Sequence, residues 1–589
     1  MAEIILREAQ TERTIAIRPG ETVFDALVRA GAAVDSYCGG AGTCGKCRVR
    51  VLNTSQVPTP GEAAHLTPEE LAGSIRLACY LEVEDGMVVE TLGGDALRVL
   101  TGGLEKEVAV NPLVQQVEIT APQGSIHDQR DIAAQILEQT GRRAVEAACL
   151  PKLACLEPGT VYGAVVLEDT IIDVRREKGS ALGVAVDIGT TTIAAYLLDL
   201  GTGRELAVES TANPQRSFGA DVISRIAFSQ SRGDGVHQLQ QALVGGLNRL
   251  IAELCRHAGA NCRDVVLLTA VGNTVMLHTL LGVSAISIAN APFVPVFSEQ
   301  VTACAKDLGI EIHPAGRVVL LPCVSGYVGA DIVADLLVCG LAEEEEFGLL
   351  IDVGTNGEIV LGNRSRLLAC SAAAGPAFEG ANLSCGMAGV RGAISAFRLD
   401  QGRAVYEVIG GGAPKGICGS GLIDIAAELL RHGFLDNTGA FTDPAGLEEW
   451  QRPMLKLKDG RPAFAAAEGI VLTQKDVREL QLAKGAVKAG VLTLLKQAGI
   501  SFEQVGTVFL AGGFGSSINL HNACRVGLIP AELEDKVVQI GNGAGVGAKL
   551  CLLDQSQLTQ ARALKRRVEY IELSTRADFQ SIFMETMLF

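Results

Sequence analysis

Two segments of the chain, 165 residues apart from Asp187 to Asp352, repeat one design. LGVAVDIGTTTIAAYLLDL and FGLLIDVGTNGEIVLGN each place an Asp-x-Gly-Thr turn between two apolar strands. Short apolar runs separated by glycine-containing turns predict buried strands. A duplicated hairpin constrains the fold strongly, because an internal repeat must be used twice in comparable surroundings. Two such hairpins facing each other could grip a polyphosphate from both sides.

The turns of the two hairpins suit phosphate binding. Glycine lets backbone amides and Thr hydroxyls approach phosphate oxygens, and an Asp carboxylate can hold Mg²⁺ directly or through water. Asp187 and Asp352 are the candidates for positioning magnesium or water, and Glu358 on the return strand is the candidate for polarising water. The residues predicted to line the phosphates are Gly189, Thr190, Thr191, Gly354, Thr355 and Asn356. The alternative is a pair of ordinary hairpin turns, with Asp as a turn cap and Glu358 as a solvated strand residue.

Glycine-rich turns after strands supply a third element, a site for adenosine. VGTVFLAGGFGSSI contains a strand followed by such a turn, and KGICGSGLIDIAAELL opens a helix whose N-terminus favours an anion. The glycines expected near the adenosine are Gly419, Gly421, Gly512, Gly513 and Gly515. Glycine can also serve close helix–strand packing without any ligand. For Asp221, Asp331 and Glu379, a place in this cleft and a purely structural role both stay open.

The stretch YCGGAGTCGKCRV, residues 37–49, is rich in both glycine and cysteine. It nearly fits a phosphate loop, but such a loop follows a strand and opens a helix. This stretch follows the amphipathic segment ETVFDALVRAGAAV and runs into the strand RVRVLN, so a metal site explains it better. The candidate ligands are Cys38, Cys44 and Cys47, spaced C-x5-C-x2-C, with Cys79 as the fourth. Four thiolates suit a [2Fe–2S] cluster; structural zinc, which usually uses two C-x2-C pairs, is the alternative.

Composition excludes several classes of protein. A chain of 589 residues is too long for one core, so we expect three or four domains. The net charge of −17 argues against a nucleic-acid partner. The polar start is unlike a signal peptide, and the sequence has no uninterrupted apolar run of about 18 residues, so we expect no membrane span. The 16 scattered cysteines do not resemble a secreted disulfide framework, and a reducing cytoplasmic location is expected.

These motifs resemble two known groups of proteins. Residues 1–95 resemble a [2Fe–2S] ferredoxin of the longer-loop, adrenodoxin kind, which implies a β-grasp fold and one-electron transfer. The two hairpins with AGGFG resemble the actin, sugar-kinase and heat-shock ATPase superfamily, which implies a duplicated ribonuclease-H-like ATPase domain. The expected fold is therefore multidomain, α/β and α+β. Its expected parts are a ferredoxin-type domain (1–95), a linker (96–118), a small α/β middle domain (119–180), a first ATPase lobe (181–345) and a second lobe (346–589).

The combination resembles the reductive activators of corrinoid-dependent proteins. Further stretches that carry this resemblance are NPQRSFGADVISRI, VGNTVMLHTLLG, LPCVSGYVGADIVADLL, SAAAGPAFEGANLSCGM, LTQKDVRELQLAKGA and GNGAGVGAKL. The resemblance covers nearly the whole chain and is weakest over 96–180. It implies ATP-dependent reduction of Co(II) to Co(I) in a corrinoid protein of a methyltransferase system, with the electron passing through the [2Fe–2S] cluster. It further implies ATP and Mg²⁺ as cofactors, a low-potential electron donor and a homodimer.

One short segment resembles a motif that binds the cobalt of a corrinoid. Glu311-Ile312-His313-Pro314-Ala315-Gly316 nearly matches the D-x-H-x-x-G by which many proteins ligate a corrinoid. Glu replaces Asp, Pro follows the histidine, and the surrounding sequence has no corrinoid-binding context. We expect His313 to be an ordinary loop residue, so that the chain acts on a corrinoid protein without carrying the cofactor.

Three other functions stay open at this point. The first is a small-molecule kinase with an accessory ferredoxin, which would need a general base and a substrate pocket. The second is a nucleotide-regulated ferredoxin subunit of a larger redox complex. The third is an activator of radical-type dehydratases. That class usually holds one [4Fe–4S] cluster between two subunits, whereas this chain has an N-terminal four-cysteine domain.

Overall fold

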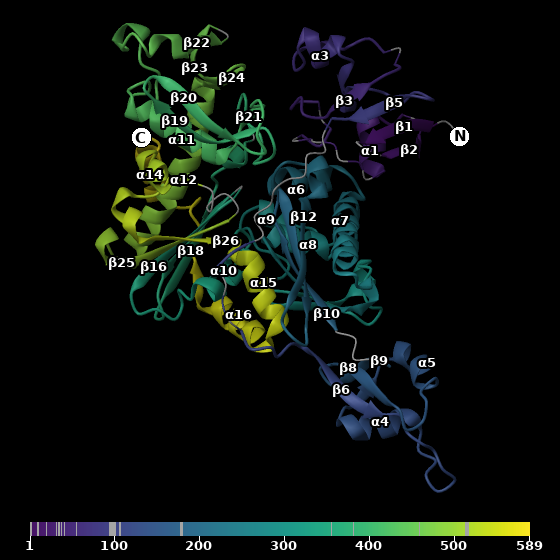
Figure 1. Cartoon of the computed structure of the whole chain (residues 1–589). Helices are drawn as coiled ribbons and strands as arrows, with labels where there is room; N and C mark the ends of the chain where they lie inside the picture. The colour runs from purple at the N-terminus through teal and green to yellow at the C-terminus, as the bar shows by residue number, and fades with distance from the viewer. Residues whose placement is uncertain are drawn as a thin grey trace.

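The computed structural model describes residues 3–589 except 9–10, 19, 31, 33, 35, 37, 41, 55, 93–101, 105, 107, 177–180, 355, 381, 459 and 513–517. It contains a ferredoxin-type domain, a small middle domain and two larger lobes (Figure 1). The ferredoxin-type domain and the part of the second lobe around β19–β24 stand at one end of the molecule, and the middle domain stands at the other (Figure 1). Within the described ranges, no helix is long and apolar enough to cross a membrane.

The ferredoxin-type domain has the β-grasp arrangement, which confirms the predicted fold. Its sheet has the order β2-β1-β5-β3-β4, with β1 parallel to β5, and the remaining paired strands antiparallel. Thr22 and Asp25 form a capping box that starts α1, which packs Val23 and Leu27 into the core. The elements are β1 (Glu3–Glu8), β2 (Thr11–Ala16), α1 (Val23–Arg29), β3 (Arg48–Val51), α2 (Pro60–Ala63), α3 (Pro68–Ala72), β4 (Ile75–Leu77), η1 (Ala78–Tyr80) and β5 (Val88–Thr91).

The middle domain is a small sheet of order β6-β8-β9-β7 with two short helices. Strand β6 begins at Val114, so the predicted linker (96–118) ends before that residue. The segment before β6 lies along the C-terminal part of the chain, where Leu104 N donates to Ile540 O and Asn111 N donates to Leu553 O. The elements are β6 (Val114–Thr120), α4 (Ile132–Thr140), β7 (Ala144–Val145), η2 (Ala147–Cys149), α5 (Leu150–Leu153), β8 (Val161–Leu167) and β9 (Thr170–Arg175).

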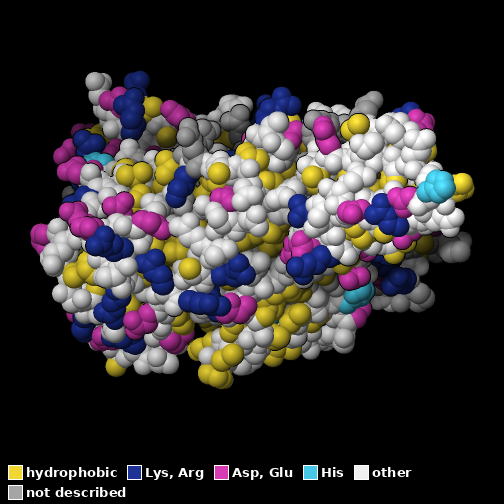
Figure 2. Space-filling model, turned by 90° about the horizontal axis from the view of Figure 1, so that it is seen from below, with side chains coloured by type: hydrophobic (Ala, Val, Ile, Leu, Met, Phe, Trp, Pro, Cys, Tyr) yellow, Lys and Arg dark blue, Asp and Glu magenta, His cyan; other side chains and the backbone are white. Residues whose placement is uncertain are grey.

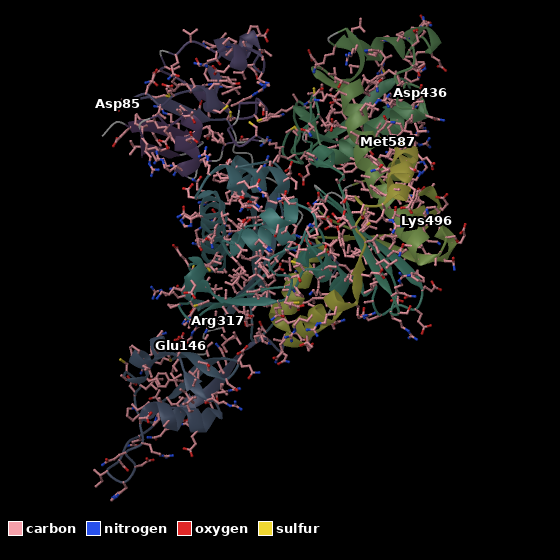
Figure 3. All side chains as sticks on the ribbon, turned by 180° about the vertical axis from the view of Figure 1, so that it is seen from behind. Asp85, Glu146, Arg317, Asp436, Lys496 and Met587 are labelled. Atoms are coloured by element: carbon pink, nitrogen blue, oxygen red, sulfur yellow. The ribbon has the colours of Figure 1, made fainter. Side chains whose placement is uncertain are left out.

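Ionic contacts fix the middle domain to the first lobe. His313 Nε2 lies 3.5 Å from Asp173 Oδ2, and Arg175 Nη1 lies 3.2 Å from Asp264 Oδ1. Figure 3 shows Glu146 on the middle domain and Arg317 on the adjoining end of the first lobe. The buried His313 is thus placed between two domains, and its position explains the histidine of the EIHPAG segment without a cobalt.

The first lobe is a six-stranded sheet of order β12-β11-β10-β13-β15-β14. Strands β10 and β11 form the first hairpin, and β13 runs parallel to β10. Its elements are β10 (Leu182–Ile188), β11 (Thr192–Asp199), β12 (Glu205–Ala212), η3 (Pro214–Ser217), α6 (Val222–Ser231), α7 (Gly235–Ala258), η4 (Cys262–Asp264), β13 (Val265–Gly272), α8 (Thr274–Leu280), α9 (Ile286–Ala289), β14 (Val301–Cys304), η5 (Ala305–Leu308), β15 (Arg317–Leu320) and α10 (Ala330–Cys339).

The second lobe repeats this plan in a sheet of order β26-β25-β16-β17-β18-β27. Two small sheets, β20-β19-β21 and β22-β23-β24, are inserted in it. Its elements are β16 (Phe347–Val353), β17 (Gly357–Gly362), β18 (Leu367–Ala372), η6 (Pro376–Glu379), β19 (Ala393–Asp400), β20 (Arg403–Val408), β21 (Gly416–Ile417), α11 (Gly419–Arg431), η7 (Pro444–Gly446), η8 (Arg452–Met454), β22 (Leu455–Lys458), β23 (Arg461–Ala467), β24 (Ile470–Thr473), α12 (Gln474–Ala498), η9 (Phe502–Gln504), β25 (Val505–Ala511), α14 (Leu520–Arg525), η10 (Ala531–Lys536), β26 (Val537–Gly541), α15 (Gly543–Leu553), α16 (Gln555–Arg567), β27 (Val568–Tyr570) and α17 (Ala577–Thr586).

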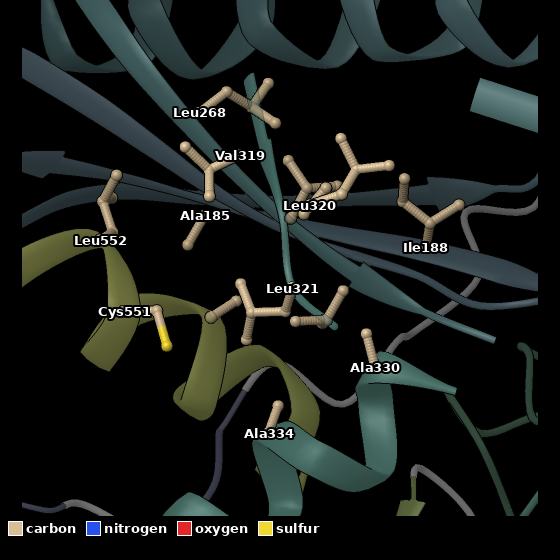
Figure 4. Close-up of a cluster of buried hydrophobic side chains, with 14 of the residues drawn as sticks. Ala185, Ile188, Leu268, Val319, Leu320, Leu321, Ala330, Ala334, Cys551 and Leu552 are labelled. Atoms are coloured by element: carbon tan, nitrogen blue, oxygen red, sulfur yellow. The ribbon is translucent and has the colours of Figure 1, made fainter. Parts of the chain in front are cut away.

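Two helices from the C-terminal part of the chain, α15 and α16, pack on the first lobe. Although α15 follows the strands of the second lobe, it packs on β10, β13 and α10 of the first lobe. Figure 4 shows Ala330 and Ala334 of α10 beside Cys551 and Leu552 of α15, beneath the sheet that carries Ala185 and Leu268. The predicted boundary at 345/346 therefore separates the two sheets but not the helices that cover them. The face in Figure 2 mixes basic and acidic side chains, without a large area of one sign.

Candidate functional site

The turn of the first hairpin is held by side chains from neighbouring elements. Asp187 stands near the end of β10, opposite Ala194 of β11. Asn213 N donates to Thr191 O at 2.8 Å, and Asn213 Nδ2 donates to Gly189 O at 2.8 Å. Asn273 Nδ2 donates to Thr190 Oγ1 at 2.9 Å. These contacts fix two carbonyl groups and one hydroxyl group of the turn. The backbone amides of the turn are thereby held in a defined position, where they can bind an anion.

The second hairpin presents a second carboxylate. Asp352 of β16 pairs directly with Glu358 of β17. Gly512, which follows β25, has a left-handed φ of 88°, and a Cβ there would stand 2.4 Å from Asp352 Oδ1. Gly512 is thus brought against Asp352, and its predicted place near the adenosine stays a prediction. Thr355, Gly513 and Gly515 lie outside the described residues.

Five carboxyl groups face one another between the two hairpins: those of Asp187, Asp331, Asp335, Asp352 and Glu358. Burial raises the pKa of Asp187 to about 7, and the charge of Asp331 adds to the rise. The pKa of Asp352 is likewise raised to about 7 by burial and by its carboxylate neighbours, and burial raises that of Asp331 to about 6. Burial, followed by the other carboxylates, raises the pKa of both Asp335 and Glu358. Buried carboxyls that repel one another need protons or a cation to compensate them.

A magnesium ion with its phosphate and water ligands fits this arrangement. Mg²⁺ usually takes one or two carboxylates and completes its octahedron with water and substrate phosphates. Among the described side chains, no group of three or more His, Cys, Asp or Glu is arranged to hold a metal ion. Both carboxyl oxygens of the buried Asp335 have no hydrogen-bond partner in the described structure. These carboxyl groups could therefore hold a cation if water and phosphate oxygens completed its ligands.

The first turn also reaches the second lobe. Thr191 Oγ1 donates to Glu379 Oε2 at 2.8 Å, a contact between residues 188 positions apart. Glu379 therefore belongs to the cleft. For Asp221 the sequence left open a place in the cleft or a structural role. In the structure it caps α6, and its carboxylate accepts a hydrogen bond from Ser224 N at 2.7 Å. Asp331 lies in the first turn of α10 and also interacts electrostatically with Asp187 and Asp352, so the two roles proposed for it are compatible.

Two glycines of the predicted adenosine site lie at the start of α11. Gly419 and Gly421 are both buried there. A Cβ at Gly421 would stand 2.2 Å from Ile394 O, so the absence of a side chain lets α11 approach β19 closely. This packing accounts for Gly421, and its role at an adenosine stays a prediction.

Several residues of the site were not predicted from the sequence. Asp335 follows Asp331 by four positions in GADIVADLL, and i,i+4 residues of a helix share a face, so this spacing was a usable signal. Asn542 caps α15 and hydrogen-bonds to Asp187. Arg225 and Asn213 lie in NPQRSFGADVISRI and reach the first turn only through the tertiary fold.

The predicted cluster ligands lie in one loop region of the ferredoxin-type domain. Cys47 Sγ lies 3.2 Å from Cys79 Sγ. Hydrogen bonding to Cys79 lowers the pKa of Cys47, and the same bond raises that of Cys79. Burial opposes ionisation of Cys38, but hydrogen bonds from Cys44 and Thr43 lower its pKa to about 6. The four thiols thus form two interacting pairs, Cys47 with Cys79 and Cys38 with Cys44. The negative charges of Cys38, Cys44 and Cys47 all raise the pKa of Cys79.

The backbone of this loop fits a bound iron–sulfur cluster. Gly42 has a left-handed φ of 80°, and a Cβ there would stand 2.8 Å from the Tyr80 hydroxyl. That hydroxyl donates to Gly42 O at 2.9 Å, which holds the loop against the residue after Cys79. Four thiol donors and a glycine loop whose amides can turn toward sulfur are what a [2Fe–2S] cluster requires. The residues present therefore fit that group.

The fold and the two sites define an electron-transfer domain of the ferredoxin type joined to a duplicated nucleotide-binding fold. Comparisons with known proteins agree with each part. Residues 6–84 match the 2Fe-2S iron-sulfur cluster binding domain, 182–344 match the RACo middle region, and 346–589 match the C-terminal domain of RACo, the ASKHA domain. The chain is 32% identical to corrinoid activation enzyme RamQ of Eubacterium limosum, over 98% of each chain. It belongs to the RACo family of reductive activators of corrinoid proteins.

Two further relatives are similar over large parts of the chain. A reductase specific for a Co(II) methylated-amine corrinoid protein, from Methanosarcina barkeri, is 24% identical over 68% of this chain and 76% of its own. The solved structure of a reductive activator for a corrinoid, iron-sulfur protein superposes with a TM-score of 0.74. It is 31% identical and covers 100% of this chain and 98% of that one.

Proposed function

We propose that the chain reactivates a corrinoid protein by reducing its cobalt from Co(II) to Co(I) in a reaction that consumes ATP. The observation that carries the proposal is the pairing, in one chain, of a four-thiol ferredoxin loop with a duplicated, carboxylate-rich nucleotide cleft. The 32% identity to a corrinoid activation enzyme extends over both parts and not over one alone. A [2Fe–2S] cluster, bound by Cys38, Cys44, Cys47 and Cys79, would supply one-electron transfer.

The chemistry gives a reason for joining the two parts. Co(I) is a state of very low potential, and for one electron each ~59 mV is a factor of about ten in the equilibrium. Nucleotide binding and hydrolysis can shift such an equilibrium only if the two states of the protein bind their partners with different affinity. Closure of two lobes around a nucleotide is a known way of producing two such states. The contact of Thr191 with Glu379 joins the lobes at the nucleotide turn and would respond to that closure.

We assign roles to the cleft residues on the geometry of the two hairpins. Asp187 and Asp352 would hold Mg²⁺ directly or through water, and Glu358, opposite Asp352, would orient the attacking water. Burial and the neighbouring carboxylates raise the pKa of Glu358, which makes its carboxylate a stronger base. The residues proposed to line the phosphates and the adenosine are Gly189, Thr190, Thr191, Gly354, Thr355, Asn356, Gly419, Gly421, Gly512, Gly513 and Gly515.

The partners follow from the same proposal. The substrate protein would be a corrinoid protein of a methyltransferase system, and a low-potential donor would reload the chain with an electron. We extend to this chain the homodimer that the family resemblance implies. The kinase alternative receives no support from a specific observation in the structure.

The test is anaerobic reduction of a Co(II) corrinoid protein, followed at the cobalt absorption bands, with and without Mg-ATP. Co(I) should form only with ATP, and it should be lost in Asp187→Ala and in Cys44→Ala. The matched control Cys155→Ser changes an exposed cysteine of the middle domain and should keep full activity. Reduction that does not depend on ATP, across several corrinoid partners and with a normally reducible cluster, would contradict the proposal.

A further inference from the structure

The segment NPQRSFGADVISRI, residues 213–226, lies between the ferredoxin-type domain and the first lobe. Ser217, at the end of η3, donates from Oγ to Val34 O at 3.1 Å. A Cβ at Gly39, next to the proposed ligand Cys38, would stand 2.7 Å from Phe218 O. The backbone of the cluster loop therefore rests directly on the end of η3.

The ferredoxin-type domain and the first lobe keep separate hydrophobic cores. A cavity of about 1030 Å³ lies beside their contact and is lined by residues of both domains, among them Arg18, Phe24 and Gln238. Across the cavity, Arg232 Nη2 lies 3.7 Å from Asp25 Oδ1, between two well-exposed side chains. Small, polar interfaces between domains separate readily. The ferredoxin-type domain can therefore leave this surface without the loss of a shared hydrophobic core.

The other end of the same segment holds the nucleotide turn. Asn213 donates to two carbonyls of the turn, as described above, and its Oδ1 accepts from Gln215 N at the start of η3. Gln215 is buried, and its Oε1 accepts from Arg225 Nη1 at 3.3 Å. Arg225 donates onward to Thr190 O and, through Nε at 3.0 Å, to Gly219 O. One hydrogen-bonded unit thus spans the distance from the nucleotide turn to the docking surface.

Arg225 is the charged member of this unit. Its side chain is 1% exposed, and its described hydrogen-bond acceptors are neutral oxygens and the sulfur of Met276. Burial lowers its pKa to about 9, and the more distant Glu379 opposes that change. A buried cation is stabilised by an anion brought near it. A polyphosphate on Gly189–Thr191 would supply that charge and strengthen the hold of Arg225 on the turn.

We propose that Asn213 and Arg225 are positioning residues that couple nucleotide occupancy of the Gly189–Thr191 turn to docking of the ferredoxin-type domain on Ser217–Gly219. The proposal rests on the proposed nucleotide site. It gives a function to the 213–226 segment, which neither binds the cluster nor contributes a carboxylate to the nucleotide cleft. The partner of this surface is the chain's own cluster loop, and the nucleotide sets how firmly that loop is held.

Hydrogen exchange of the full-length, cluster-loaded protein tests the coupling, with nucleotide affinity measured separately by calorimetry. Mg-ATP should change the exchange rate of peptides that contain Val34 and Gly39 by about twofold or more. In Asn213→Ala, saturating Mg-ATP should leave those peptides unchanged. In Ser217→Ala, nucleotide affinity should stay within about twofold of wild type, because the lost hydroxyl contacts the ferredoxin-type domain, while the exchange response disappears.

Asn261→Ala is the matched control, because Asn261 caps η4 in the same lobe without touching the nucleotide turn. It should keep the wild-type response; a lost response there would show general destabilisation and overturn the proposal. Wild-type protein that binds Mg-ATP without any change at Val34 and Gly39 would overturn the coupling and leave the proposed function intact. Wild-type protein that binds no nucleotide would overturn both. Should Asn213→Ala fail to fold, Ser217→Ala decides the question by itself, since a retained response there would refute the coupling.

Discussion

The two nucleotide hairpins have the same topology but differ in how they are held and in the charge that they carry. The first turn is tied to its surroundings by Asn213, Asn273 and Arg225, and it bonds to Glu379 of the other lobe. In the second hairpin, the described turn contacts are local: Gly354 N donates to Asn356 O at 3.0 Å, and the Asn356 side chain hydrogen-bonds to Glu358. Opposite Asp187 stands Ala194, whereas opposite Asp352 stands Glu358.

This difference shows how the two copies of a duplicated hairpin can take different roles. Both copies keep the aspartate, which is what a shared cation requires. The first copy became the anchored one, connected to the ferredoxin-type domain through η3. The second copy carries the additional carboxylate, Glu358, to which we assign the activation of water. Each of the following changes tests one side of this division.

The largest effect should come from Glu358→Gln. The substitution removes the carboxylate that distinguishes the second hairpin, and loss of a general base lowers the rate by about 10²–10⁴-fold. The melting temperature should not fall, because a buried carboxylate that repels Asp352 and Asp331 is removed. Steady-state ATP hydrolysis and thermal melting measure the two outcomes. Glu407→Gln, on the exposed part of β20, is the matched control, and equal losses in both variants would refute the assignment.

The next effect contrasts the glycines of the two turns. A Cβ at Gly189 would stand 2.7 Å from the backbone oxygen of Thr192, while a Cβ at Gly354 would make an ordinary 3.8 Å contact with Asn356 O. Overpacking costs about 1–3 kcal/mol, so Gly189→Ala should weaken Mg-ATP binding by about 5–150-fold. Gly354→Ala should change it by less than about threefold. Calorimetric titration measures both, and similar losses would remove the distinction between an anchored and a local turn.

A smaller effect is expected for the bond that joins the lobes. Thr191→Val keeps the shape of the side chain but removes the hydrogen bond to Glu379. A hydrogen bond contributes about 0.5–1.5 kcal/mol, so Mg-ATP affinity should fall by about 2–12-fold. Thr575→Val, at an exposed position of the second lobe, serves as the control. An unchanged affinity in Thr191→Val would mean that the contact between the lobes is not used in the nucleotide-bound state.

The smallest effect is expected on the melting temperature, and it concerns the aspartate that each hairpin carries. The folded-state pKa values of Asp187 and Asp352 are raised from an ordinary 3.8 to about 7. Folded protein therefore holds protons that unfolded protein releases, so this stabilisation is present below about pH 4 and is lost as pH rises to about 7. Asp187→Asn and Asp352→Asn should each raise the melting temperature at pH 7.5 by about 2–4 °C, the shift that 1 kcal/mol produces in domains of about 150–250 residues.

The control for this last prediction is the same pair of variants at pH 4, where the carboxyls are protonated and the variants should melt close to wild type. A gain for Asp352→Asn but not for Asp187→Asn would mean that the two aspartates do not share one electrostatic environment. Added Mg²⁺ should raise the melting temperature of wild type at pH 7.5 more than that of either variant, because the ion compensates the same repulsion.

Much of the fold could be read from local sequence pattern. Strands β10, β11, β16 and β17 are unbroken apolar runs around glycine turns, and such runs predict buried strands without knowledge of their neighbours. The packing of α15 on the first lobe could not be predicted in this way. Nothing in GNGAGVGAKLCLL indicates that α15 packs on β10 and β13, because an apolar helix fits any apolar face. The start of β6 was missed for a related reason, since VQQVEIT alternates too weakly to stand out from a linker.

The sequence by itself determined which side chains are available for chemistry in this protein: the thiols that we propose for iron, the carboxyls for magnesium and the glycine turns for phosphate, and their order along the chain. These properties depend on residue type and short-range spacing, which are covalent facts. The tertiary structure alone decided which carboxyls meet, that Arg225 and Asn213 stand behind the first turn, and that the cluster loop rests on η3. Asn213 and Gly189 are 24 positions apart, and Ser217 and Val34 are 183 positions apart. Such contacts are set by the packing of whole sheets and helices, which no local pattern encodes.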